Sequence, residues 1–112
     1  VVKEEVHSRL FEGGAVTRQP LVTAEMSKNY SFALINFDPG ARNIFHTHTS
    51  DQILYVTDGE GIVATEAGEV VVRVGDIILI PSGEKHWHGA TQDSSFSHIS
   101  LQTADSTTSI FD

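Results

Sequence analysis

The chain has 112 residues, of which 39% are hydrophobic and 20% charged, and this composition is typical of one soluble globular domain. The sequence contains no cysteine, which excludes disulfides, thiolate metal ligands and a cysteine nucleophile. The net charge of −8 argues against binding to nucleic acid or to an anionic membrane, because no cluster of Lys and Arg is present to neutralise phosphates.

The sequence shows no sign of a membrane span or a targeting segment. No apolar run approaches the roughly 18 residues that a transmembrane helix requires. Lys3, Glu4 and Glu5 occupy the place where a signal peptide would need an apolar segment. We therefore expect a protein without a membrane-spanning helix and a cytoplasmic location.

The first thirty residues contain few strand signals. Residues 1–15 are polar and end near Gly13-Gly14, so a short strand or arm followed by a loop is expected, and His7 in this segment is assigned no role. Residues 16–22 contain Pro20, which permits only an edge or terminal strand. Residues 26–29 resemble a turn.

The remaining chain alternates short strand patterns with turns rich in Gly and Pro. Strands are predicted at 30–37, 44–48, 52–57, 62–66, 70–74, 77–80, 85–90 and 96–102, and turns at 38–40, 58–61, 67–69, 75–76 and 81–83. The tail from Thr103 either frays or docks its apolar end, Ile110-Phe111, on the rest of the domain or on a partner subunit. With no helical period in the sequence, these patterns predict an all-β sandwich or closed barrel.

Two stretches carry the residues that favour metal binding. In the first, His46 and His48 are two residues apart, so on a strand both imidazoles point to the same face. Gln52, on the next predicted strand, adds an amide oxygen, and His86 comes from the second stretch, residues 75–90. Three imidazoles and one amide oxygen leave open coordination positions on a divalent ion, as in catalytic sites. This ligand set suits Mn, Fe, Co, Ni or Zn.

The spacing of these residues resembles the two motifs of the cupin superfamily. Gly40 to Gly59 follows G-x5-HxH-x3-Q-x6-G, and Gly75 to His86 follows G-x5-P-x-G-x2-H. The resemblance covers roughly residues 30–102. It implies an all-β cupin double-stranded β-helix, or jelly-roll barrel, as a single domain over residues 1–112 with a barrel core at about 30–102. By the same resemblance, the metal ligands are His46, His48, Gln52 and His86.

The sequence departs from the family pattern at two positions. Gln52 stands where the family usually has Glu, and Ala90 stands where the second motif often has Asn. The change to Gln leaves the ion with its full formal charge, which makes it a stronger Lewis acid. It also removes a carboxylate base from the ligand set, which argues against oxalate-type chemistry and against dioxygenases that depend on that carboxylate.

Two further histidines are expected beside the metal. His88 is two residues from His86, and His98 on the last strand shares a face with Ser100 and Gln102. Imidazoles in this position serve as general acid and base, or they orient ligands and close hydrogen bonds in a polar barrel.

The run GEKHWHGA, with FSHISLQ on the following strand, narrows the resemblance. It is similar to small bacterial cupins that include the manganese-dependent hydroxynitrile lyases and their uncharacterised relatives. This resemblance implies manganese as the first choice of metal, with Fe, Ni, Co or Zn as alternatives. The residues that it implies are His88 and His98 as the catalytic pair, and Ala33, Ile35 and Gln102 as substrate-binding residues.

Arg42 and Trp87 complete the set of candidates. Arg42 is a candidate substrate-binding residue for an anion or carboxylate, and its alternative is a pair with an acidic residue at the barrel rim. Trp87 lies between His86 and His88, so it faces away from the site and belongs to the core or to an interface.

Three kinds of function fit these observations. The favoured one is a metal-dependent lyase acting on a small organic substrate, with mandelonitrile-type cyanohydrins implied by the resemblance. The second is another cupin enzyme, a dioxygenase or a sugar or uronate isomerase, and the third is a small-molecule-binding cupin without turnover. The expected partners are a small-molecule substrate and further copies of the chain, as a dimer or higher homo-oligomer, with no nucleic acid and no membrane.

Overall fold

The computed structural model describes residues 3–5 and 8–111, and His7 lies outside this part of the chain. The described residues form strands and loops without any helix, and so include none that is long and apolar enough to cross a membrane. The strands are β1 (Glu4–Glu5), β2 (Phe11–Glu12), β3 (Val16–Val22), β4 (Tyr30–Phe37), β5 (Arg42–Asn43), β6 (His46–His48), β7 (Gln52–Thr65), β8 (Gly68–Arg73), β9 (Ile77–Ile80), β10 (His86–Ala90), β11 (Phe96–Thr103) and β12 (Thr108–Ile110).

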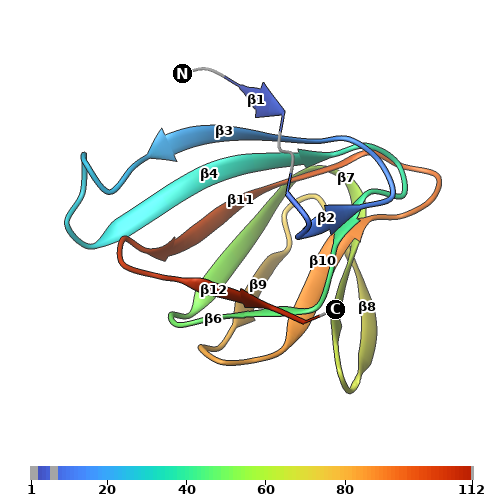
Figure 1. Cartoon of the computed structure of the whole chain (residues 1–112). Coiled ribbons are helices and arrows are strands. Elements are labelled where there is room, and N and C mark those ends of the chain that lie inside the picture. Colours follow the sequence, from blue (N-terminus) through green and yellow to red (C-terminus); the bar gives the residue numbers. More distant parts are fainter. Residues whose placement is uncertain (1–2, 6–7, 112) are drawn as a thin grey trace.

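All strand pairs are antiparallel, and the strands curl into two facing sheets (Figure 1). One sheet runs in the order β1, β3, β4, β11, β7 and β9. The other holds β8, the second half of β7, β10 and β5, with β2 beside β5; β6 also pairs with β10, and β12 pairs with β6. The predicted all-β jelly-roll fold is therefore confirmed.

The long strand β7 belongs to both sheets. Its first part pairs with β9 and β11, and from Glu60 onward it pairs with β8 and β10. The predicted turn at 58–61 is therefore wrong, because the chain bends from one sheet into the other and does not reverse. Gly59 and Gly61 are needed for close contact: a Cβ at Gly59 would collide with the carbonyl of Ser95, and one at Gly61 with the ring of Phe96.

Two other predictions need adjustment. The strand expected at 44–48 covers only His46–His48 (β6), and the separate short strand β5 precedes it at Arg42–Asn43, because Ile44 and Phe45 leave the ladder and the Ile44 amide bonds to the carbonyl of Leu10. The tail does not fray: β12 pairs with β6, with Thr108 opposite His48 and Ile110 opposite His46. As expected, Pro20 lies in a part of β3 that has no partner on its outer side within the described chain.

The interior is divided along the strands into an apolar end and a polar end. At the apolar end Phe37 and Phe96 are fully buried and stack with ring centroids 5.9 Å apart, next to Val16 and Val56. Farther along β4 and β11, the inward residues are small or polar, and the space between the sheets opens into a cavity. Because side chains alternate between faces of a strand, the fold places one wall of the site on each sheet.

The outer face of the first sheet is apolar. Ile77 and Leu79 of β9 are 69% and 59% exposed, and they lie opposite Tyr55 and Ile53 of β7, which are 43% and 37% exposed. Their neighbours on the same face of β11 and β4 are also apolar: Ile99, Leu101, Leu34 and Phe32. An exposed apolar patch of this kind is typical of an interaction surface, and it contrasts with the net charge of −8 of the whole chain.

Candidate metal centre

Three histidines meet between the sheets, as the sequence predicts. His46 and His48 project from β6, and His86 at the start of β10 is the ladder partner of His46. All three side chains are buried, and one nitrogen from each lies within 4.8 Å of the others. Imidazole nitrogens at this separation are placed to share one ion.

The outer nitrogen of each ring is held by an oxygen. The Nδ1 bonds run from His46 to the carbonyl of Ile44 (2.7 Å), from His48 to the hydroxyl of Thr108 (2.9 Å) and from His86 to the carbonyl of Glu84 (2.8 Å). A carbonyl only accepts, so Nδ1 of His46 and of His86 carries the proton. The side-chain amide of Gln102 faces Nε2 of His48 at 3.3 Å and donates to it, which gives His48 the same tautomer. The Nε2 lone pairs of His46 and His86 are therefore available to a metal, and that of His48 becomes available when the Gln102 amide moves away from it.

Gln52 completes the set of donors. Its amide nitrogen donates to the hydroxyl of Ser100 at 2.8 Å, and its Oε1 faces Nε2 of His86 at 3.1 Å. Both facing atoms are acceptors, and two acceptors in contact require a positive charge between them or beside them. An amide turned by 180° would satisfy His86 without an ion, but the observed orientation presents the oxygen that a divalent cation binds. The residues present therefore fit a metal with three nitrogen ligands and one oxygen ligand.

Burial keeps these imidazoles neutral. It lowers the pKa of His46 to about 3 and that of His48 to about 4, with the neighbouring His86 adding to both shifts. Burial also lowers the pKa of His86. A ligand must be deprotonated to bind a metal, so the site is ready to do so at neutral and moderately acid pH.

His88 and His98 form a second imidazole pair next to the first cluster. Nδ1 of His88 and Nε2 of His98 are 3.2 Å apart, and both rings are buried. Burial lowers the pKa of His98 to about 4 and that of His88 well below its ordinary value, with the nearby imidazoles adding to the shift of His88. Both rings are thus neutral at physiological pH. One proton lies between them, and its position decides whether His88 presents a proton or a lone pair at Nε2.

Asn43 orients His88 and was not found from the sequence. Its Oδ1 accepts the backbone N–H of His88 at 2.8 Å, and its Nδ2 lies 3.4 Å from both ring nitrogens of His88. Asn43 is 2% exposed and sits on β5, which pairs with β10. The sequence alone does not indicate this role, because Asn43 is brought to His88 only by the pairing of β5 with β10.

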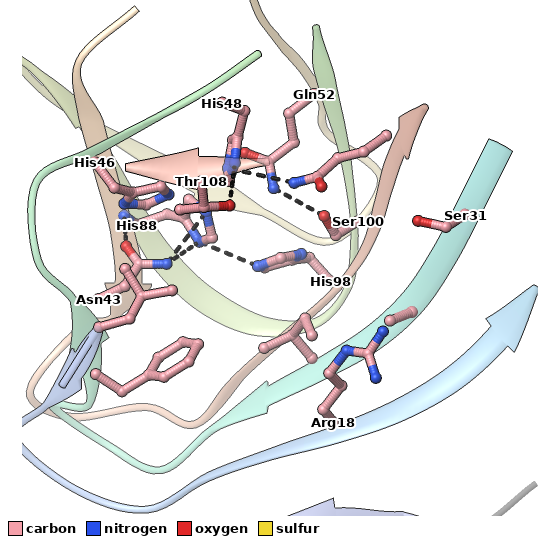
Figure 2. Close-up of a pocket in the computed structure, with 15 residues that line it drawn as sticks. Arg18, Ser31, Asn43, His46, His48, Gln52, His88, His98, Ser100 and Thr108 are labelled. Carbon is pink, nitrogen blue, oxygen red and sulfur yellow. Dashed lines mark hydrogen bonds between the residues drawn. The ribbon is translucent and has the colours of Figure 1, made fainter. Parts of the chain in front are cut away.

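The histidines line a cavity of about 220 Å³ that opens to solvent. Figure 2 shows His46, His48, Gln52 and His88 on one side of it and Arg18 and Ser31 on the other. The remaining lining is Leu10, Phe11, Ala33, Ile35, Asn43, His98, Ser100, Gln102 and Thr108. None of the lining residues is an Asp or a Glu. Among the lining side chains, imidazole is therefore the group best suited to general acid–base chemistry.

The other predicted site residues divide into two groups. Ala33, Ile35 and Gln102 line the cavity, as implied for substrate-binding residues. Arg42 does not: its guanidinium lies 3.7 Å from the centroid of the Trp87 ring and its Nε is 3.6 Å from the Glu12 carboxylate. The structure thus favours the alternative given for Arg42, a pair with an acidic residue, over contact with substrate.

Comparisons with known proteins agree with this geometry. The family model described as a cupin domain matches residues 33–101. The chain belongs to the cupin family. A cupin-like protein from Thermotoga maritima, known from its crystal structure, superimposes with a TM-score of 0.89 at 32% identity, over 96% of this chain and 83% of the other.

Two curated relatives differ in their named activities. The (R)-mandelonitrile lyase of Granulicella tundricola is 39% identical over 80% of this chain and 69% of its own length. An acireductone dioxygenase of Trichormus variabilis is 35% identical over 63% of this chain, which spans only 47% of that enzyme. These comparisons establish the cupin family of the chain, and the two relatives carry different named activities.

Proposed function

We propose that this cupin is a metal-dependent lyase of the hydroxynitrile-lyase-like group that acts on a small organic substrate. The observation that carries the proposal is the neutral His88–His98 pair beside a carboxylate-free metal cradle. The relative named (R)-mandelonitrile lyase supports the choice of substrate class, a cyanohydrin. Manganese is the first choice of metal, and Fe, Ni, Co and Zn fit the same donors.

In this proposal His46, His48, Gln52 and His86 hold the ion. When bound, the ion supplies a Lewis acid with open positions inside the pocket. Gln52 adds no charge, so the pocket stays positive and favours the developing charge on a substrate oxygen or on cyanide. Ser100 fixes the amide of Gln52, and Thr108 fixes the ring of His48.

His88 moves the proton in the proposed reaction. It takes the hydroxyl proton of the cyanohydrin at Nε2, and the oxygen electrons form the aldehyde carbonyl. The C–C bond breaks, cyanide leaves with its electron pair, and His88 returns the proton to give hydrogen cyanide. His98 bonds to the opposite nitrogen of His88 and stabilises its ring in either form. Burial makes His88 neutral at the start, which is the form that a base requires.

The proposal is tested with the manganese-loaded protein and mandelonitrile. Benzaldehyde release should be lost in His88→Ala while metal content is kept, and both should be lost in His46→Ala. A Lys85→Ala variant serves as a control, because Lys85 pairs with Glu66 and does not line the cavity. Release no faster than that of His46→Ala would refute the lyase.

A dioxygenase is the second candidate, because relatives named acireductone dioxygenase match about two thirds of the chain. Oxygen uptake by the iron- or nickel-loaded protein with an acireductone or a diketone, without aldehyde release from mandelonitrile, would favour it. Aldose–ketose conversion would favour an isomerase. A tightly bound ligand without turnover would favour a binding protein.

We also propose that the chain forms a homodimer through the outer face of the first sheet. On this face Ile53, Tyr55, Ile77 and Leu79 are 37–69% exposed, and a contiguous exposed apolar patch of this kind is typical of a protein–protein interface, where each partner buries ~800 Å². The apolar neighbours on β4 and β11 extend it. Because the apolar part of this face carries no charge, a second copy with the same net charge of −8 can approach it there without strong repulsion.

A further inference from the structure

Arg18 brings a positive charge into the pocket from the side opposite the histidines. It lies on β3, directly opposite Ile35 of β4, which in turn lies opposite His98 of β11. Residues opposite one another share a face of the sheet, so Arg18 is on the inner face, and it lines the cavity together with Ser31. Two strand spacings separate the Cα atoms of Arg18 and His98, or about 10 Å. Figure 2 shows Arg18 and Ser31 across the cavity from the metal cradle.

The guanidinium of Arg18 has no carboxylate partner among the described residues. Other cations of this chain do pair: Arg42 with Glu12, Arg73 with Glu60 and Lys85 with Glu66. Glu4 on β1 is the ladder neighbour of Arg18, and the two side chains form no ion pair. Arg18 thus keeps its hydrogen-bond donors available on the side of the pocket.

The charge of the pocket is opposite to that of the chain. The chain carries −8, yet the cavity lining contains Arg18 and no Asp or Glu. The histidines are neutral, and a bound divalent ion would make the pocket more positive still. A small anion is therefore attracted to this opening and repelled by the surrounding surface.

We propose that Arg18 and Ser31 form an anion-binding end of the pocket, and that the natural ligand carries a carboxylate there while its other end faces the histidines. Guanidinium binds carboxylate through two parallel N–H···O bonds, and a serine hydroxyl adds a third donor. The volume of about 220 Å³ limits the ligand to a small molecule, below the 300–1,000 Å³ common for drug-sized ligands. The inference concerns binding, so it holds for the lyase and for any other reaction at this site.

The test compares dicarboxylates with their monoamides. Malonate, succinate, glutarate and adipate, each beside its monoamide, are titrated calorimetrically into the metal-loaded protein. At least one dicarboxylate should bind about ten-fold or more tightly than its monoamide, because the one carboxylate of the monoamide goes to the metal ion and its amide at Arg18 forms no charge-assisted pair. In Arg18→Met this preference should fall to less than about two-fold, while the affinity for the monoamide stays the same. Arg18→Lys should retain part of the preference for the dicarboxylate, since lysine keeps the positive charge but cannot donate two parallel N–H bonds to one carboxylate.

Two variants separate anion binding from a structural role of Arg18. Arg73→Met removes a cation that pairs with Glu60 outside the cavity, and it should leave the preference unchanged. Glu4→Gln removes the ladder neighbour of Arg18. If Arg18→Met and Glu4→Gln lower the melting temperature equally and the dicarboxylate preference survives in both, the proposal is overturned. An equal affinity of the unaltered protein for all dicarboxylates and their monoamides would overturn it as well.

Discussion

Thr108 offers the sharpest test of the candidate metal site. Of the three oxygens that bond to Nδ1 of His46, His48 and His86, only that of Thr108 belongs to a side chain. His46 and His86 bond to backbone carbonyls, which a substitution cannot remove, whereas His48 bonds to the Thr108 hydroxyl at 2.9 Å. Thr108→Val deletes this hydroxyl and keeps both the volume and the β-branched shape. The pairing of β12 with β6 uses the backbone, so it should persist.

The expected loss of metal affinity follows from the deleted hydrogen bond. Removing a group that supports a metal ligand weakens metal binding about 10- to 100-fold, or about 1.4–2.7 kcal/mol. An unpaired buried N–H costs about 1–3 kcal/mol, which agrees with that range. In the metal-free protein His48 can move its proton to Nε2 and avoid most of this cost. The effect should therefore be larger on metal affinity than on the stability of the metal-free protein.

Competition with a chromophoric chelator for Mn²⁺ and Zn²⁺ measures the effect. Ser109→Ala is the matched control, since Ser109 is the next residue of β12 and its side chain is exposed. Its affinity should equal that of the unaltered protein. Affinities of Thr108→Val and Ser109→Ala within two-fold of each other would show that the tail does not support the metal ligand.

Three further outcomes are expected. Gln52→Glu should raise affinity for divalent ions at least about ten-fold and lower the lyase rate, because the carboxylate offsets the charge of the ion; equal affinities would contradict this. Leu79→Asp should yield a monomer in sedimentation, whereas Val71→Asp, an exposed substitution on the other sheet, should leave the oligomer intact. The metal-free protein should lose stability as pH falls from about 7 to 5, because unfolded histidines bind protons near pH 6.5 while His46, His48 and His98 stay neutral down to about pH 4. Each such proton contributes up to about 1.4 kcal/mol per pH unit, and urea midpoints that stay flat over this range would contradict the buried, neutral state.

The clustering of the candidate metal-binding residues could be predicted because the information is local. His46 and His48 share a face by strand parity alone, and a short link returns the chain so that Gln52 faces the same interior. His86 lies in a separate stretch, and the pairing of β10 with β6 brings it to His46. Motif spacing implied this pairing, and the structure confirms it.

Residues that reach the site from polar segments could not be predicted. Thr108 contacts a residue sixty positions away, and nothing in a tail rich in Ser and Thr indicates a strand. In β3 the residues on both faces include polar ones, so the sequence does not show that Arg18 faces inward. The turn predicted at 58–61 failed for the opposite reason: Gly59 and Gly61 are strong turn signals, but here they allow close packing against Ser95 and Phe96.

The lining of this pocket contains no carboxylate, and this affects both the candidate metal site and Arg18. With Gln at position 52, the charge of a bound ion is not reduced by its ligands, and the guanidinium of Arg18 finds no acidic side chain inside the cavity. Both positive centres would therefore act on a bound ligand, and the two neutral imidazoles, His88 and His98, could exchange a proton without adding a negative charge. A carboxylate at position 52 would weaken the attraction for an anion and also supply a competing base. In the proposed function, the Gln52 side chain would thus determine both the charge of the ligand that the pocket prefers and the residue that moves the proton.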